Sequence, residues 1–251
     1  MKILYLSLFP ETNSCNEIAN LEYFRNSAEY YGISDLFSYR LFSNHDCMVN
    51  TLRTVFDCED YKQEKLFDFE KYPIQVERLF FDTVYRDTMN EKRAHEIAWS
   101  KQRIFAYTTF KHVLDRFDYI FYNDADIKID AKDIHELCKV LEVRNFDETI
   151  YPSFINIPYV IKLKKQIVSD SFGSFIIPTK VIEDVAHVEK SLYEIYEQDG
   201  KFYRKNAPDW ILRQQLIREG YKEIRGESCN TKHYINDNKY YEFDAGKLTF
   251  N

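Results

Sequence analysis

Residues 118–127 read Asp-Tyr-Ile-Phe-Tyr-Asn-Asp-Ala-Asp-Ile. The apolar and aromatic run inside this segment predicts a buried central strand. The strand leads directly into Asp124 and Asp126, two carboxylates one residue apart. In an open α/β sheet, ligands bind at the carboxyl ends of the strands. Because two neighbouring carboxylates repel each other, the pair predicts a divalent cation held between them.

A second buried strand is predicted at the start of the chain, where residues 3–8 form a short apolar run. A polar loop follows, and apolar residues then recur at helical spacing up to residue 31. Ser14 and Glu17 form a capping-box pattern at the start of this helix, and Gly32 is placed to end it. No G-x-G-x-x-G pattern follows the strand, so the dinucleotide-binding fingerprint is absent.

The rest of the chain alternates between strand and helix patterns without a Gly/Pro-rich linker. Strands are predicted at 36–42, 75–81, 149–157, 167–177 and 221–225. Helices are predicted at 47–56, 91–114, 131–141, 180–197 and 206–220, and the residues from 226 onward are expected to be irregular. This succession predicts one α/β domain over residues 1–251, with a mixed, mostly parallel sheet flanked by helices.

Composition and charge narrow the range of partners. The net charge of −7 argues against nucleic acid, whose phosphates require clustered Lys and Arg. Aromatic residues make up 17% of the chain, which favours a large aromatic core, the alternative being tyrosines that line a sugar or base site. Five widely spaced cysteines without a C-x-x-C pair favour reduced thiols in a cytoplasmic compartment.

The apolar run at residues 3–9 is interpreted as a strand rather than a signal peptide, because it ends at Pro10-Glu11 without a small-residue cleavage site. No segment approaches the ~20 consecutive apolar residues of a membrane span. The sequence therefore predicts a protein without a membrane span.

A solvated acidic turn is the simplest interpretation of Asp124 and Asp126, and several functional ones compete with it. An EF-hand loop is rejected, because the required Gly is missing and the twelfth position is His135. A phosphohydrolase of the haloacid-dehalogenase type also places D-x-D after a strand, with the first Asp as nucleophile. That family carries the motif on its first strand, followed by Thr or Val, whereas this motif lies mid-chain before Ile127 and Lys128.

The segment 122–127 resembles the D-x-D motif of GT-A glycosyltransferases, which follows a hydrophobic strand near the middle of a Rossmann-like domain. The resemblance implies that Asp126 chelates Mn²⁺ or Mg²⁺, and that Asp124 bonds the donor ribose and often the metal. It also implies that the loop around Phe9 and Pro10 meets the nucleotide base. The chemistry fits the pattern, because a leaving nucleoside diphosphate gathers negative charge that a divalent cation neutralises.

A second resemblance involves residues 233–239, His-Tyr-Ile-Asn-Asp-Asn-Lys. They are similar to the H-F-x-G-x-x-K element of retaining transferases of the glycogenin and lipopolysaccharide galactosyltransferase type. This implies that His233 is the third metal ligand and that Lys239 contacts the diphosphate. Asn236 stands where the family has Gly, a replacement that a left-handed backbone tolerates. The Pro-Trp that follows in the family is absent here.

Three more residues are candidates for the site. Asp209 opens a predicted helix in a segment similar to the acidic, acceptor-side segment of GT-A enzymes, where it would bond sugar hydroxyls or act as general base. The alternative is a carboxylate that merely stabilises a helix N-terminus. Asp170 is a secondary catalytic or sugar-binding candidate. Lys101 either extends its stem to the surface or points toward a bound phosphate.

Together these residues predict a metal-dependent glycosyltransferase. It would move a sugar from a nucleotide-diphosphate donor, most simply a UDP-sugar, to a glycan or other hydroxyl acceptor, with retention favoured over inversion. The alternatives are a metal-dependent phosphohydrolase that uses the Asp124/Asp126 pair and a non-catalytic module that binds nucleotide-sugars.

Overall fold

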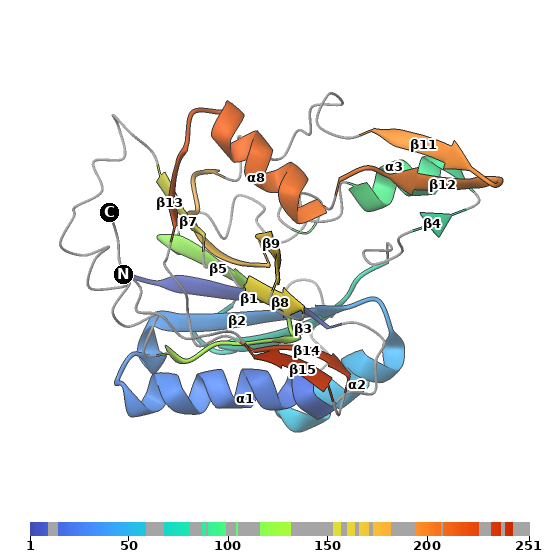
Figure 1. Cartoon of the computed structure of the whole chain (residues 1–251). Helices are drawn as coiled ribbons and strands as arrows, with labels where there is room; N and C mark the ends of the chain where they lie inside the picture. Colours follow the sequence, from blue (N-terminus) through green and yellow to red (C-terminus); the bar gives the residue numbers. More distant parts are fainter. Residues whose placement is uncertain are drawn as a thin grey trace.

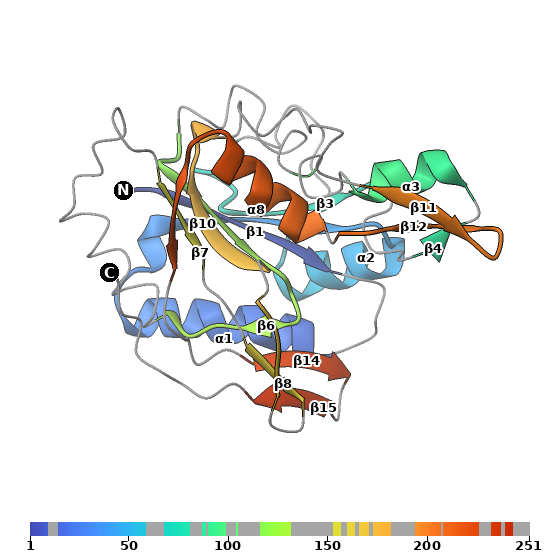
Figure 2. The same ribbon diagram turned by 45° about the horizontal axis from the view of Figure 1, so that its top comes forward.

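The structure is a computed structural model of the whole chain (Figures 1 and 2). It describes residues 1–9, 15–58, 68–80, 87–88, 90–98, 104, 116–131, 153–156, 160–163, 166–170, 173–181, 194–206, 208–225, 232–236 and 239–242. For 15–16, 87–88, 96–98, 153–156, 160–163, 166–170, 204, 224–225, 232–236 and 239–242 it describes the main chain alone.

A seven-stranded sheet forms the centre of the fold, in the order β13-β7-β10-β5-β1-β2-β3. Its strands are β1 (Ile3–Phe9), β2 (Phe37–Ser43), β3 (Ile74–Arg78), β5 (Tyr119–Asn123), β7 (Ser153–Asn156), β10 (Ser174–Pro178) and β13 (Lys222–Arg225). Only β10 runs antiparallel to the other six strands. The predicted mixed, mostly parallel α/β sheet is therefore confirmed.

Strand β1 lies inside the sheet, between β5 and β2, and all seven of its residues are buried. Helices cover both faces: α1 (Cys15–Tyr30) and α2 (Asp46–Val55) lie on one side and α8 (Pro208–Arg218) on the other (Figure 1). Side chains of a strand alternate between faces, so two separate cores form. Ile3 and Tyr5 belong to the core under α1, whereas Leu4 and Leu6 pack with Leu212 of α8.

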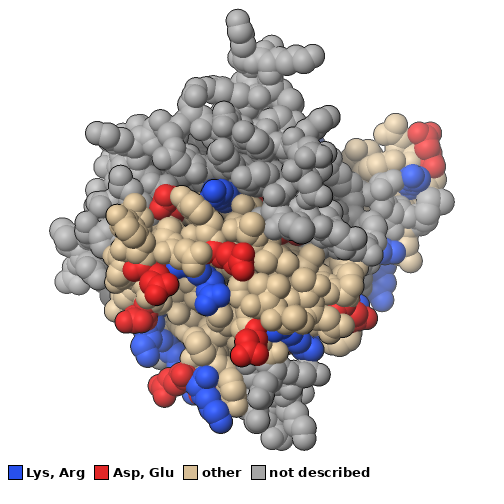
Figure 3. All heavy atoms as spheres, turned by 90° about the horizontal axis from the view of Figure 1, so that it is seen from below, with Lys and Arg blue, Asp and Glu red and all other residues tan. Residues whose placement is uncertain are grey.

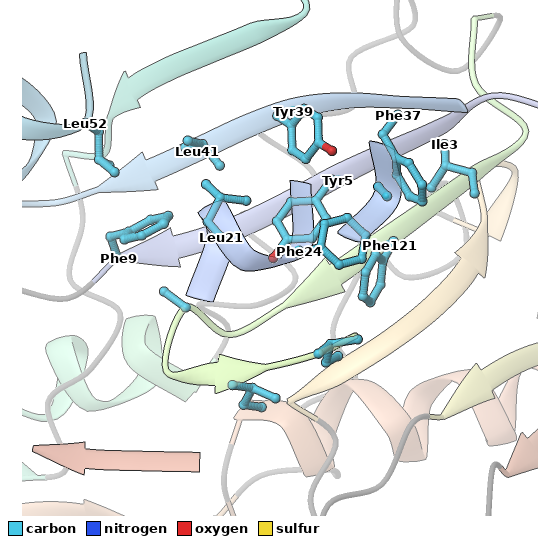
Figure 4. Packing of buried hydrophobic residues seen from close by; sticks show 14 of the residues in the cluster. Ile3, Tyr5, Phe9, Leu21, Phe24, Phe37, Tyr39, Leu41, Leu52 and Phe121 are labelled. Atoms are coloured by element: carbon cyan, nitrogen blue, oxygen red, sulfur yellow. The ribbon is translucent and has the colours of Figure 1, made fainter. Parts of the chain in front are cut away.

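Aromatic rings fill much of the core under α1 (Figure 4). The ring of Tyr5 lies 5.1 Å from those of Phe24 and Phe121, and 5.3 Å from that of Tyr39, measured between centroids. The Tyr5–Phe121 pair meets edge to face, an arrangement that aromatic quadrupoles favour. For these residues the high aromatic content serves packing, as the composition suggested.

Glycine ends both long described helices. After α1, Gly32 takes φ +68°, its N–H bonds the carbonyl of Glu29, and the Ile33 N–H bonds that of Ala28. This Schellman motif confirms the predicted end of the helix. Gly220 has φ +90° and closes α8 in the same way.

The predicted helices at 47–56 and 206–220 correspond to α2 and α8. Of the helix predicted at 91–114, the structure describes the beginning as α3 (Glu91–Ala98) and Ile104 as helical. A short 3-10 helix at Ser34–Leu36 precedes β2. Most of the helix predicted at 131–141 lies outside the described residues, apart from its first residue, Ala131.

The helix prediction for 180–197 is wrong at its end. Residues Ile195–Gln198 form β11, which pairs antiparallel with β12 (Lys201–Arg204), and β4 (Asp87–Thr88) extends this sheet to three strands. Asp199 and Gly200 make the two-residue turn with φ of +53° and +71°. An Asp-Gly pair between two strand-forming runs indicates a hairpin turn. The helical spacing of the apolar residues before it favoured a helix instead. Figures 1 and 2 show this hairpin extending outward beside α3.

The irregular tail is a second correction. Residues Lys232–Asn236 form β14 and Lys239–Glu242 form β15, joined as an antiparallel pair, and β14 also pairs with β6 (Ile127–Lys128). The predicted strand at 167–177 is divided into β9 (Gln166–Asp170), which pairs with β8 (Val160–Leu163), and β10. The hydrogen-bond partner β6 lies far away in the sequence, so local patterns could not reveal it.

Candidate functional site

The two carboxylates lie in a tight turn where β5 ends. The Asp124 N–H donates to the carbonyl of Gly173 at 2.9 Å, and the Ile127 N–H donates to the carbonyl of Asp124 at 2.9 Å. Asp124 and Asp126 are half-buried. The parallel strands β1, β2 and β3 end at this same edge of the sheet. The motif therefore lies where open α/β sheets bind their ligands.

A buried tyrosine orients the first carboxylate. The Tyr122 hydroxyl donates to Asp124 Oδ1 at 2.8 Å. The Tyr122 side chain is wholly buried, and its ring stacks on Phe175 with centroids 5.2 Å apart. Because a stacked, buried ring has little freedom, its hydroxyl holds the Asp124 carboxylate in one orientation. This role of Tyr122 was not predicted, although residues two apart on a strand share a face.

Buried polar groups of the strands hold both ends of the turn. The Ser7 hydroxyl donates to the carbonyl of Asn123 at 2.7 Å. The Asn123 amide nitrogen donates to the carbonyl of Ile127 at 2.9 Å and to the Tyr5 hydroxyl at 3.1 Å. Asn123 is 3% exposed. These bonds satisfy buried main-chain carbonyls, which would otherwise destabilise the turn.

The β14–β15 pair brings two distant candidates to this edge. In the ladder between β14 and β6, His233 lies opposite Ile127, which follows Asp126. Lys239 opens β15 and lies opposite Asn236. Figures 1 and 2 show the pair beside α1. The side chains of His233 and Lys239 lie outside the described part of the chain, so their ligand roles stay predictions.

Asp170 and Asp209 lie in elements that reach the same edge. Asp170 ends β9, three positions before Gly173, and its side chain lies outside the described part. Asp209 is the second residue of α8 and is half-buried. Helix α8 leads into β13, which runs parallel to β7 and so starts at the amino edge of the sheet. The helix therefore begins toward the carboxyl edge, where the carboxylate turn lies.

The predicted nucleotide-base loop is only partly described. Phe9 ends β1 at the carboxyl edge, but its side chain is wholly buried in the core under α1. The Phe9 ring therefore packs in the core, and the expectation that the loop around it meets the nucleotide base stays a prediction. Pro10 and Lys101 lie outside the described residues.

The predicted donor set suits a divalent cation. Asp124 and Asp126 offer carboxylate oxygens, and His233 would add an imidazole nitrogen. Mn²⁺ accepts both donor types, whereas Mg²⁺ prefers oxygen alone. Among the described residues, no three His, Cys, Asp or Glu side chains cluster as a metal site. The His233 side chain lies outside the described part of the chain, so the three-ligand set remains a prediction.

A large open depression lies at the opposite edge of the sheet. Its volume is about 1220 Å³, and its lining includes Lys2, Arg25, Asp35, Arg116 and Asp118. Charges of both signs line it, and none of the predicted site residues does. The candidate site is therefore the carboxyl edge, where the carboxylate turn and its buried supports lie.

Seen from below, the described surface has no extended patch of basic side chains. Figure 3 shows acidic and basic side chains interspersed on this side, where α1 lies in Figure 1. Nucleic acids bind clustered basic residues, so this face offers them no footprint. Within the described ranges, no helix has the length and apolar character needed to cross a membrane.

Comparison with known proteins gives distant structural likenesses. No family model and no curated protein matches the chain. A solved 4-diphosphocytidyl-2C-methyl-D-erythritol synthase aligns at 10% identity and a TM-score of 0.45, over 89% of this chain and 88% of that one. A glycosyltransferase involved in the glycosylation of the major capsid of PBCV-1 aligns at 8% identity and a TM-score of 0.35. That alignment covers 74% of this chain and 64% of that one.

Proposed function

We propose that this chain is a metal-dependent glycosyltransferase that moves a sugar from a UDP-sugar to a hydroxyl group of a glycan or similar acceptor. The observation that supports it most is the pairing of β14 with β6, which aligns His233 with the residue after Asp126. Two sequence elements that resemble one family, far apart in the chain, are thereby neighbours in space.

In this proposal Asp124, Asp126 and His233 hold Mn²⁺. The bound cation would neutralise charge on the departing diphosphate. Lys239 and Lys101 would contact the phosphates as point charges. The Tyr122 hydroxyl keeps Asp124 oriented by the bond already described, so that carboxylate requires little reorganisation when the donor binds.

The acidic residues around the turn would bind the sugars of the donor and the acceptor. Carboxylates accept hydrogen bonds from sugar hydroxyls, and Asp209 and Asp170 are proposed to fix donor and acceptor in this way. Retention is favoured by the resemblance of residues 233–239, with an oxygen of the leaving phosphate taking the acceptor proton. In an inverting enzyme Asp209 would take that proton as general base.

Calorimetric titration with UDP, in the presence and absence of Mn²⁺, tests the proposal. Saturable UDP binding that requires Mn²⁺ is expected. No metal-dependent binding would refute the transferase and its metal site. A screen of UDP-sugars for UDP release then separates the remaining cases. Binding without turnover of any donor would favour a binding module, and release of inorganic phosphate would favour a phosphohydrolase.

A further inference from the structure

A polar stripe on helix α1 contacts the segment that contains the carboxylate turn. Asn20, Tyr23 and Ser27 recur at helical spacing, beside the apolar residues that face the sheet. Each of the three forms a hydrogen bond with a residue between Ala125 and Ala131. One helix therefore holds the turn and the segment after it.

The contact of Asn20 lies inside the motif itself. Its amide nitrogen donates to the carbonyl of Ala125 at 3.0 Å, and Ala125 separates Asp124 from Asp126. Asn20 and Ala125 are each 5% exposed. A buried carbonyl without its donor is costly, so this bond favours one arrangement of the turn over its alternatives.

Tyr23 and Ser27 hold the residues that follow. The Tyr23 hydroxyl donates to Asp130 Oδ2 at 2.8 Å, and the Lys128 ammonium lies 3.8 Å from the centroid of the Tyr23 ring. The Ser27 hydroxyl accepts the N–H of Ala131 at 3.0 Å. These bonds continue the attachment of the segment to α1 beyond the motif.

Residues of the strands and a residue of helix α1 form hydrogen bonds with different atoms of the turn. Ser7 and Asn123 bond the carbonyls on either side of the motif, at Asn123 and Ile127. Asn20 bonds the carbonyl in its middle. Removing Asn20 thus frees the middle of the turn while its two ends remain attached.

We propose that α1 positions the metal-binding turn and that Asn20 is its principal positioning residue. Asn20 keeps Asp124 and Asp126 in the arrangement that a divalent cation requires, without touching the cation. A turn held before binding loses less freedom when it takes up the ion, so the ion binds more tightly. The metal part of this inference rests on the proposed function.

A purely structural role for Asn20 is the alternative, and a matched variant separates the two. The buried Thr179 hydroxyl donates to the carbonyls of Phe117 and Asp118 at the opposite end of β5. Asn20→Ala and Thr179→Val each remove a buried donor to the main chain beside that strand. Both are expected to lower the denaturant midpoint, but only Asn20→Ala changes the turn.

The first measurement is amide hydrogen exchange of the free protein at Asp124 and Ile127. Asn20→Ala should speed exchange there by about fivefold, the factor that corresponds to one typical hydrogen bond, and Thr179→Val should not. Unchanged exchange at both amides in Asn20→Ala would overturn the inference. This result does not depend on any metal, so it is separate from the proposed function.

The second measurement is Mn²⁺ affinity in the presence of saturating UDP. Asn20→Ala should weaken it by about fivefold on the same reasoning, and Thr179→Val should leave it unchanged. Wild-type protein that binds no Mn²⁺ would refute the proposed function and the metal part of the inference. Wild-type binding with equal affinity in Asn20→Ala would overturn the positioning role alone.

Should Asn20→Ala fail to fold, Tyr23→Phe provides the same test. Tyr23 is 37% exposed, and this change removes only the hydroxyl that bonds Asp130. Faster exchange at Ala131 is expected, with about twofold weaker Mn²⁺ binding. Exchange and affinity equal to those of the wild type would count against α1 as the positioning helix.

Discussion

His233 and Ile127 lie opposite each other in the ladder between β14 and β6. Ile127 directly follows Asp126, so the main chain of the tail runs beside the exit of the carboxylate turn. This relationship turns two separate sequence patterns into one candidate site.

Asp126→Ala is expected to abolish the Mn²⁺-dependent part of UDP binding. Loss of a residue that only hydrogen-bonds a metal ligand lowers metal affinity by up to about a hundredfold. Asp126 is proposed as a ligand itself, so its loss should lower Mn²⁺ affinity by at least about a hundredfold. Titration calorimetry with UDP and Mn²⁺ measures it. Asp118→Ala is the control, since this exposed carboxylate lies at the amino end of β5. Intact metal dependence in Asp126→Ala would remove the carboxylate pair from the site.

His233→Ala should weaken Mn²⁺ binding by at least about a hundredfold, because a direct imidazole ligand is lost. Lys239→Ala should instead weaken UDP binding at saturating Mn²⁺, because a cation beside the phosphates is lost. Competition between Mn²⁺ and a chelating dye measures the first effect and calorimetry the second. Lys232→Ala, on the same strand as His233, should change neither. If His233→Ala binds Mn²⁺ like the wild type, the β14–β15 pair has no part in the metal site.

Asp209→Asn is expected to slow sugar transfer by about 10²- to 10⁴-fold if Asp209 acts as general base, and by less if it only bonds hydroxyls. Affinity for UDP with Mn²⁺ should stay within about twofold, because only the sugar contacts change. Initial rates of UDP release measure the effect. Asp199→Asn is a matched control on the β11–β12 turn, where Asn tolerates the positive φ. If Asp209→Asn transfers sugar at the wild-type rate, the Asp209 carboxylate only stabilises the N-terminus of α8.

Stability should fall in alkaline solution because of Tyr5. Burial raises the pKa of Tyr5 above its usual range, against the opposing effect of the hydrogen bond from Asn123. The folded protein therefore keeps the phenol proton at pH values where the unfolded chain releases it, which favours unfolding as pH rises. The loss begins near pH 10, the unfolded pKa, and reaches at most about 1.4 kcal/mol per pH unit for this group.

Denaturant unfolding at pH 8 and at pH 11 measures this effect. Tyr5→Phe should lower stability at pH 8, where the bond from Asn123 is lost, but should show a smaller further loss at pH 11. Burial also raises the pKa of Tyr39, so a part of the alkaline loss should persist in Tyr5→Phe. An identical pH dependence in the two proteins would contradict the assignment to Tyr5.

The elements that sequence patterns predicted well are those with local causes. The central strand β5, the first strand β1 and the glycine ends of α1 and α8 depend on runs of apolar residues or on a positive φ at one position. The helix predicted through residue 197 was wrong in its last residues because a two-residue turn at Asp199 outweighed the helical spacing. The prediction of an irregular tail from residue 226 onward was wrong because the partner of its strand β14 is β6, which lies far away in the sequence.

The candidate site shows the same division. The D-x-D pair was found because its carboxylates are close in sequence and follow an apolar run. The residues that orient it were missed. Tyr122, Asn123 and Ser7 belong to strands whose pattern only indicates burial, and Asn20 is one of many polar residues of α1. The burial of the Phe9 ring was not predicted either, because its place at a strand end could not show on which side the ring packs.

By itself, the sequence determined the class of fold, the position of Asp124 and Asp126 at a strand end, and the chemistry that such a pair favours, since each follows from the order of neighbouring residues. Tertiary structure alone decided which distant residues hold the turn and that β14 runs beside it. The physical reason is that buried carbonyls, such as that of Ala125, require donors, and folding supplies them from whichever element packs nearby, here Asn20 of α1.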